Sequence, residues 1–265
     1  MKGNHTISAL VWFALWAAAC LVTPANAADD LHVVVTVNAG QTTFAFEEKL
    51  DQEVTFVMLN PALTLLLGDF YLSASLAASI ANEDISEEEE TGEASHQEFD
   101  LTLGYRLSER WTLFGGYHRG ETEIEFKARD AEDLPNPPPP FTDTITVSGP
   151  YLGGSWSRPS ESAGTVTLSL AYAPFDFEGD FNSNLDPDPE DEVEFDDETG
   201  KVSGPSNGFG FTARWSIPLG SDWYYAAQLK YNLYRQNATF ADSGNSYDIE
   251  ESVTFFAMGL SWLLR

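Results

Sequence analysis

The sequence predicts an all-β protein, an antiparallel up-and-down transmembrane β-barrel of ten strands. Apolar residues alternate with small or polar residues in many segments, which is the period of a strand with two different faces. Short gaps rich in turn residues alternate along the chain with long, charged gaps. Tight turns at one end and long loops at the other are typical of barrels that cross a bacterial outer membrane.

Residues 1–27 are predicted to be a signal peptide, and residues 28–265 to form the barrel domain. Lys2 makes the short N-terminal region positively charged, and an apolar run extends from Ile7 to Val22. Ala25-Asn26-Ala27 then supplies small residues for cleavage. A retained membrane helix and a lipoprotein cut before Cys20 are the alternatives. On the favoured interpretation the mature chain has no cysteine, because Cys20 is the one cysteine of the sequence.

Ten segments fit the strand pattern when the chain is divided at these gaps. They begin near Leu31, Val54, Phe70, Gln97, Trp111, Thr144, Thr165, Asn207, Trp223 and Asp248. The first two alternate poorly, and Asn60-Pro61 interrupts the second, which indicates a bulge or an edge. An eight-stranded barrel with a periplasmic lead-in is therefore the alternative. An even number of strands places both termini at the tight-turn end, in the periplasm.

The composition of the second face indicates what the apolar face meets. In the segment 207–217, one face carries Phe209, Phe211, Ala213, Trp215 and Ile217, and segments 99–107 and 165–172 repeat the pattern. A water-facing surface in a chain with 42 acidic residues would carry many of them, yet the second face is mostly Gly, Ser, Thr and Ala. The apolar face is therefore expected to meet lipid, where a charge at mid-depth costs about 2–4 kcal/mol.

The segment 111–126 is expected to cross from lipid into water. Trp111, Leu113 and Tyr117 are predicted to face lipid, while Thr112, Phe114, Gly116 and His118 face the lumen. Beyond Arg119 the strand is expected to leave the bilayer, which explains Glu121, Glu123 and Glu125. Aromatic residues near both strand ends are predicted to form two interfacial girdles: Trp111, Trp215, Trp223, Tyr225 and Trp262 near the turns, and Phe99, Phe175 and Phe209 near the loops.

The charge of the chain is concentrated in its long gaps. The formal net charge of −29 argues against nucleic acid or an anionic membrane surface as a partner. One gap offers hard oxygen ligands of the kind that Ca²⁺ prefers, and Asp186, Asp188, Glu190 and Asp191 are candidates for diffuse binding of divalent cations, such as those that bridge lipopolysaccharide phosphates. No EF-hand loop is present, and self-repelling disorder is the alternative interpretation of this gap.

The stretch GYRLSERWTLFGGY, residues 104–117, resembles the strand, turn and strand units of small outer-membrane barrels of the OmpA-like and opacity-type superfamily. The chain end is similar as well, with Gly259 followed by Trp262 and Leu264 in the spacing of the family's assembly signature, although Ala257 and the final Arg265 depart from it. The resemblance implies a location in the bacterial outer membrane, with membrane lipids, lipopolysaccharide and the assembly machinery as partners.

The sequence does not predict an enzyme. The mature histidines are His32, His96 and His118, and neither His96 nor His118 sits in the motif expected of an outer-membrane protease or lipid A deacylase. No cofactor and no ordered metal site are expected.

The lumen is expected to carry Asp100, Arg106, Arg214 and Lys230, either as an ion-pair plug or as the lining of a narrow anion-selective pore. The predicted function is a structural or surface-interaction role through long acidic extracellular loops. The alternative is a narrow channel or porin-like pore for small solutes.

Overall fold

The computed structural model describes residues 31–47, 52–86, 90–128, 140–160, 163–182 and 199–264. The predicted signal peptide and the candidate cation ligands Asp186, Asp188, Glu190 and Asp191 lie outside the described residues. The strands are β1 (Leu31–Glu47), β2 (Gln52–Leu67), β3 (Phe70–Ser79), β4 (Glu83–Ser86), β5 (Glu90–Arg106), β6 (Trp111–Ala128), β7 (Phe141–Ser160), β8 (Gly164–Phe181), β9 (Gly200–Pro218), β10 (Trp223–Phe240) and β11 (Ser246–Leu264).

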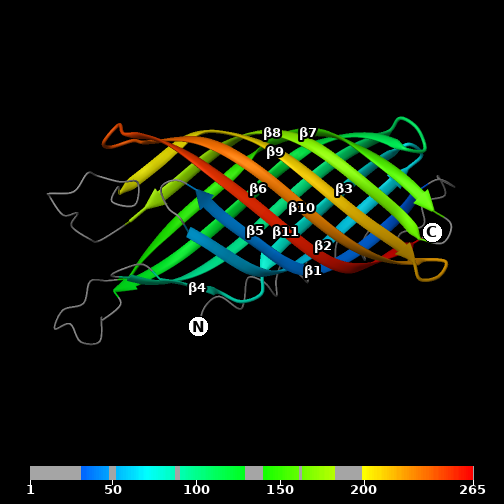
Figure 1. Cartoon of the computed structure of the whole chain (residues 1–265), viewed down its shortest axis with the longest axis horizontal. Coiled ribbons are helices and arrows are strands. Elements are labelled where there is room, and N and C mark those ends of the chain that lie inside the picture. The colour runs from blue at the N-terminus through cyan, green and yellow to red at the C-terminus, as the bar shows by residue number, and fades with distance from the viewer. Residues whose placement is uncertain are drawn as a thin grey trace.

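These strands form one closed antiparallel sheet (Figure 1). Strands that follow one another in sequence pair with each other, except that β3 pairs with β5 instead of β4, and β1 closes the barrel on β11. The short β4 pairs with β5 beyond the end of β3, so β3 and β4 together occupy one position in the barrel. The ten-stranded prediction is therefore confirmed, and the eight-stranded alternative is wrong.

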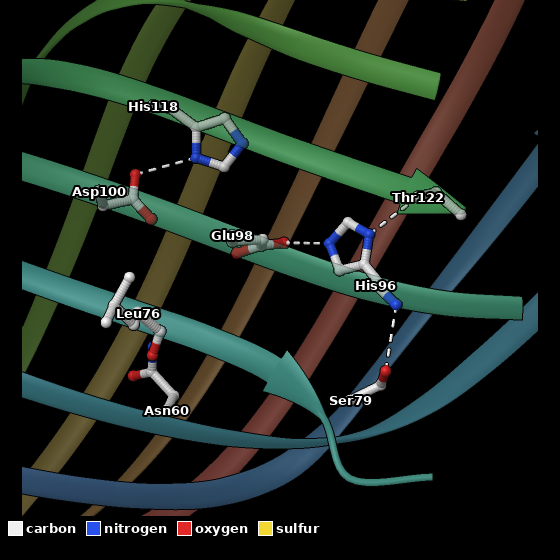
Figure 2. Close-up of polar contacts among 8 residues, drawn as sticks. All are labelled: Asn60, Leu76, Ser79, His96, Glu98, Asp100, His118 and Thr122. Carbon is white, nitrogen blue, oxygen red and sulfur yellow. Dashed lines mark hydrogen bonds and ion pairs between the residues drawn. The ribbon is translucent and has the colours of Figure 1, made fainter. Parts of the chain in front are cut away.

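Pro61 lies inside β2 without breaking its register. The pairing of β2 with β3 would place Pro61 opposite Leu76, where proline has no N–H to donate. The Asn60 side chain donates to the Leu76 carbonyl oxygen instead, at 2.9 Å (Figure 2). The predicted interruption is therefore local, and β2 stays paired with β1 through Pro61 and Val37.

The outward face of the barrel is apolar in the half next to the tight turns, which we call the turn end. Leu101, Leu103, Leu168 and Phe211 are 40%, 56%, 37% and 43% exposed. Trp111, Leu113 and Tyr117 also lie outward, as do Phe99 and Phe209, so the predicted orientation of these faces is confirmed. We call this outward apolar zone the lipid-facing belt. On β9 it spans residues 209–217, close to the length that crosses a bilayer.

The two faces exchange character toward the opposite end, which we call the loop end. On β8 the exposed residues change from Leu170 and Tyr172 to Asp176 and Glu178, while the inward residues change from small ones to Phe175 and Phe177. The strand keeps its period of two throughout, so the exchange reflects a change of surroundings and not of register. Strand β8 therefore passes from a lipid-facing zone into a water-facing zone.

This exchange corrects two sequence-based expectations. Phe175 is 5% exposed and points inward, so it is not part of an interfacial girdle. The strands are also longer at the loop end than predicted: β5 begins at Glu90, β8 continues to Phe181 and β9 begins at Gly200. Outward charged residues in the water-facing zone have the composition of a loop, which hid these strand segments from the sequence analysis.

The interior of the loop-end half is a packed apolar core. One cluster gathers around Phe44, Phe56, Met58, Phe126 and Phe175, and a second contains Phe177, Val202, Phe240, Tyr247 and Ile249. Such packing is typical of the interior of a water-soluble β-barrel. Among the described residues there is no helix long and apolar enough to cross a membrane.

Candidate functional site in the lumen

A polar cluster lies inside the barrel where the lipid-facing belt gives way to the water-facing zone. Strand β5 contributes His96, Glu98 and Asp100 from alternate positions, which point inward because successive side chains of a strand alternate between faces. Strand β6 places His118 opposite Asp100, Gly120 opposite Glu98 and Thr122 opposite His96. Figure 2 shows the resulting row of side chains along the two strands.

Asp100 and His118 form the first hydrogen-bonded pair of this cluster. Their Oδ1 and Nδ1 atoms are 2.9 Å apart, and His118 is 9% exposed (Figure 2). The His118 ring stacks on Phe175 with 5.2 Å between ring centroids and 16° between planes. A carboxylate on one side and a phenyl face on the other therefore fix the orientation of the imidazole.

His96 and Glu98 form the second pair. The Nε2 atom of His96 is 3.1 Å from Oε1 of Glu98, and its Nδ1 atom is 2.8 Å from the Thr122 hydroxyl (Figure 2). Phe44 and Phe56 pack against the ring, at centroid distances of 4.5 and 5.6 Å. With both ring nitrogens engaged and 5% exposure, His96 is held in one place.

Strands β10 and β11 form the opposite side of this site. Glu251 is 6% exposed and accepts a 2.6 Å hydrogen bond from Nε2 of Gln236. A cavity of about 40 Å³ lies between this wall and the histidines, lined in part by Asn232, Tyr234 and Glu251. A cavity of this size has room for water.

The cluster has the donor atoms of a metal site. Glu98, Asp100 and His118 each offer one ligand atom, and these atoms lie within 4.8 Å of one another. Two carboxylates and one imidazole are ligands that Zn²⁺ and several first-row transition metals accept.

The residues predicted to lie in the lumen take different positions. Asp100 belongs to the cluster, and Lys230 lies close enough to Glu98 for an electrostatic interaction. Arg214 is half-buried on β9, opposite Thr167 and Gln228 in the register. Arg106 lies at the turn end, where its guanidinium binds Asp69 at 2.9 Å and its side chain is 56% exposed. The structure therefore brings Asp100 and Lys230 into one region but not Arg106.

Glu98, Glu251 and Gly120 were not among the sequence-predicted lumen residues. Glu98 could have been predicted from its position in the strand. It lies two residues from Asp100 and therefore shares the inward face of β5. Glu251 likewise shares the inward face of β11 with Val253 and Ala257. Glu98 stands at the start of the strand predicted to begin near Gln97, directly after an acidic gap, and was not counted among the lumen residues.

No protein-family model matches the chain, and no curated protein matches it. Among solved structures, the chain is similar to the outer-membrane protease OmpT from Escherichia coli, with 13% sequence identity, a TM-score of 0.51, and coverage of 89% of this chain and 97% of that one.

Two further solved structures are similar at lower scores. The translocator domain of the autotransporter NalP from Neisseria meningitidis has 10% identity and a TM-score of 0.48, covering 98% of this chain and 97% of that one. The attachment invasion locus protein Ail from Yersinia pestis has 10% identity and a TM-score of 0.40, covering 88% and 99%. At these identities the comparisons concern the fold alone, which is that of an outer-membrane β-barrel.

Proposed function

We propose that this protein is a non-enzymatic bacterial outer-membrane barrel with a closed interior, which acts as a structural or surface-interaction protein through its loop end. The observation that carries the proposal is the packed apolar core of the loop-end half. Phe56, Phe240 and Val202 are each about 1% exposed, and they fill the region through which a solute would pass. A conducting pore needs a continuous water-filled path, which such packing removes.

The water-facing zone supports a role in surface interaction. Residues 200–208 of β9 continue beyond the lipid-facing belt, and at a tilt of about 40° they extend roughly 20 Å from the membrane. Its outward face is acidic, with Glu121, Glu123 and Glu125 on β6 and Asp176 and Glu178 on β8. Such a surface suits cationic partners and the divalent cations that bridge lipopolysaccharide phosphates.

The proposed orientation places the turn end and both termini in the periplasm and the loop end outside the cell. Its support is the general layout of outer-membrane barrels, in which short turns are periplasmic. A maleimide that cannot cross the membrane should label Ser243→Cys at the loop end in intact cells, but Gly220→Cys at the turn end only after permeabilisation. The reverse labelling would contradict the orientation.

The absence of enzymatic activity is also part of the proposal. The Asp100–His118 pair lies inside the lumen beside a cavity of about 40 Å³, and the packed apolar core of the loop-end half limits access to it. Hydrolase activity of the refolded protein toward a peptide or acyl ester that is lost in both His118→Gln and His96→Gln would overturn this part.

Single-channel recording in planar bilayers tests the closed interior. The folded protein should give no steady conductance steps, because side chains fill the loop-end half of the lumen. An outer-membrane porin reconstituted in the same bilayers provides the positive control. Steady, reproducible steps from the folded barrel would favour the alternative, a narrow channel for small solutes.

A further inference from the structure

The cavity wall on β6 contains a glycine at the point that His118 faces. A Cβ atom built at Gly120 would lie 3.2 Å from Nε2 of His118, 3.7 Å from Cε1 of His96 and 3.9 Å from Cγ of Glu98. Any larger residue would therefore occupy the space between these three side chains. Gly120 has no unusual backbone conformation that would require glycine, so its contribution is this space.

The Nε2 atom of His118 is directed at this space and has no hydrogen-bond partner among the described residues. Its other ring nitrogen is held by Asp100. An imidazole nitrogen without a protein partner is available as a metal ligand.

The fixed charges near this space are predominantly negative. Glu98, Asp100 and Glu251 lie in the same region, Glu98 and Glu251 interact electrostatically with each other, and Lys230 is the lysine that reaches Glu98. His96 and His118 also interact with these carboxyl groups, so the cluster sets three carboxyl groups against one lysine and two imidazoles. Buried carboxylates without compensating positive charge are costly, and a divalent cation would offset that cost.

We propose that the lumen binds one divalent transition-metal ion of the Zn²⁺ class, with Glu98, Asp100 and His118 as its protein ligands. Ligand atoms around Zn²⁺ at about 2.1 Å lie roughly 3.4 Å apart in a tetrahedral site. The three donor atoms lie within 4.8 Å of one another, and side-chain rotations would have to bring them to that spacing. The adjoining cavity has room for a water molecule as the fourth ligand.

The site would link β5 to β6 where the barrel leaves the membrane, and it would fix the boundary between the two zones. This inference goes beyond the proposed function, because a closed barrel needs no metal. Single-channel recording tests the closed interior and Zn²⁺ titration tests the metal site, so either proposal can be contradicted without the other.

Isothermal titration calorimetry tests the proposal on the complete mature chain, folded in detergent micelles and stripped of metal with a chelator. Zn²⁺ is titrated in the presence of excess Ca²⁺, which occupies diffuse carboxylate sites in the acidic gaps but competes poorly for a site with an imidazole ligand. We expect one saturable Zn²⁺ site per chain.

Three variants locate the site. His118→Gln and Glu98→Gln remove a ligand, and each should weaken Zn²⁺ binding by at least about 10-fold, with about 100-fold as the upper range. Gly120→Ala keeps all three ligands but fills the space that His118 faces, and it should also weaken binding. His32→Gln is the matched control, because it removes a histidine at the turn end.

A folded barrel migrates differently on an SDS gel before and after boiling, and this heat shift shows whether each variant is folded. Loss of Zn²⁺ binding in a folded variant then cannot be explained by unfolding of the barrel. Absence of a saturable site in the folded unmodified chain would overturn the proposal. Equal Zn²⁺ binding in His118→Gln, Glu98→Gln and the unmodified chain would also overturn it, since the ions would then bind elsewhere.

Discussion

At the scale of single residues, the interior of the loop-end half depends on aromatic packing around His96. Phe56 is 1% exposed, makes an edge contact with Phe44 at 5.8 Å and stacks on His96 at 5.6 Å. These contacts position the imidazole that binds Glu98 and Thr122. The apolar core and the polar cluster are therefore one packed unit.

Replacing Phe56 by alanine should destabilise the barrel strongly. The variant loses buried apolar surface and leaves a cavity, so we expect the free energy of unfolding to fall by about 3–5 kcal/mol. Urea unfolding in lipid vesicles measures the change. Phe209→Ala is the control, because Phe209 is 61% exposed on the lipid-facing belt and its removal leaves no internal cavity. Equal losses in the two variants would contradict the assignment of Phe56 to a core.

The candidate site was only partly predictable at this scale. The inward positions of Asp100 and His118 were predicted from the alternation of apolar and polar residues, which is clear in both strands. Glu98 lies only two residues from Asp100 on the same face, but it directly follows an acidic gap at the start of the predicted strand, so its inward position was not expected. No pattern in the sequence reveals that Gly120 leaves space between His96, Glu98 and His118, since this depends on the pairing of β5 with β6.

At the scale of strands, the exchange of faces is what distinguishes the two halves of each element. In β8 the outward residues Val166, Leu168 and Leu170 are exposed apolar side chains, while Asp176 and Glu178 follow on the same face. A strand that stayed in one environment would keep one character on each face. Sequence patterns predicted the lipid-facing part of these strands well, and they missed the water-facing part because its outward residues are charged.

Arginine substitutions on the outward face of β8 should show this difference. Leu170→Arg places a charge in the lipid-facing belt and should lower the free energy of unfolding by about 2–4 kcal/mol. Asp176→Arg places the same side chain on the same face in the water-facing zone, where the expected change is within about 0.5 kcal/mol. Unfolding of both variants in lipid vesicles by urea is the measurement. A similar cost at the two positions would be inconsistent with two environments along one strand.

At the scale of the whole molecule, the two halves of one ten-stranded barrel bury their apolar side chains in opposite ways. The turn-end half has an apolar exterior, as lipid requires, and the loop-end half has an apolar interior, as water requires. The sequence predicted the strand number and the closure, because turns and gaps alternate along the chain. It did not predict the height of the water-facing zone, because strand pairing there is formed by residues whose composition is that of a loop.

The most direct test of this account is an accessibility scan along the outward face of β6 with the protein in lipid vesicles. Single cysteines replace Leu113, Tyr117, Glu121 and Glu125 in turn, each carries a nitroxide spin label, and electron paramagnetic resonance measures collision with oxygen and with a water-soluble nickel complex. We predict that labels at 113 and 117 collide mainly with oxygen, as in lipid, and that labels at 121 and 125 collide mainly with the nickel complex. Uniform collision with either reagent along all four positions would contradict the account.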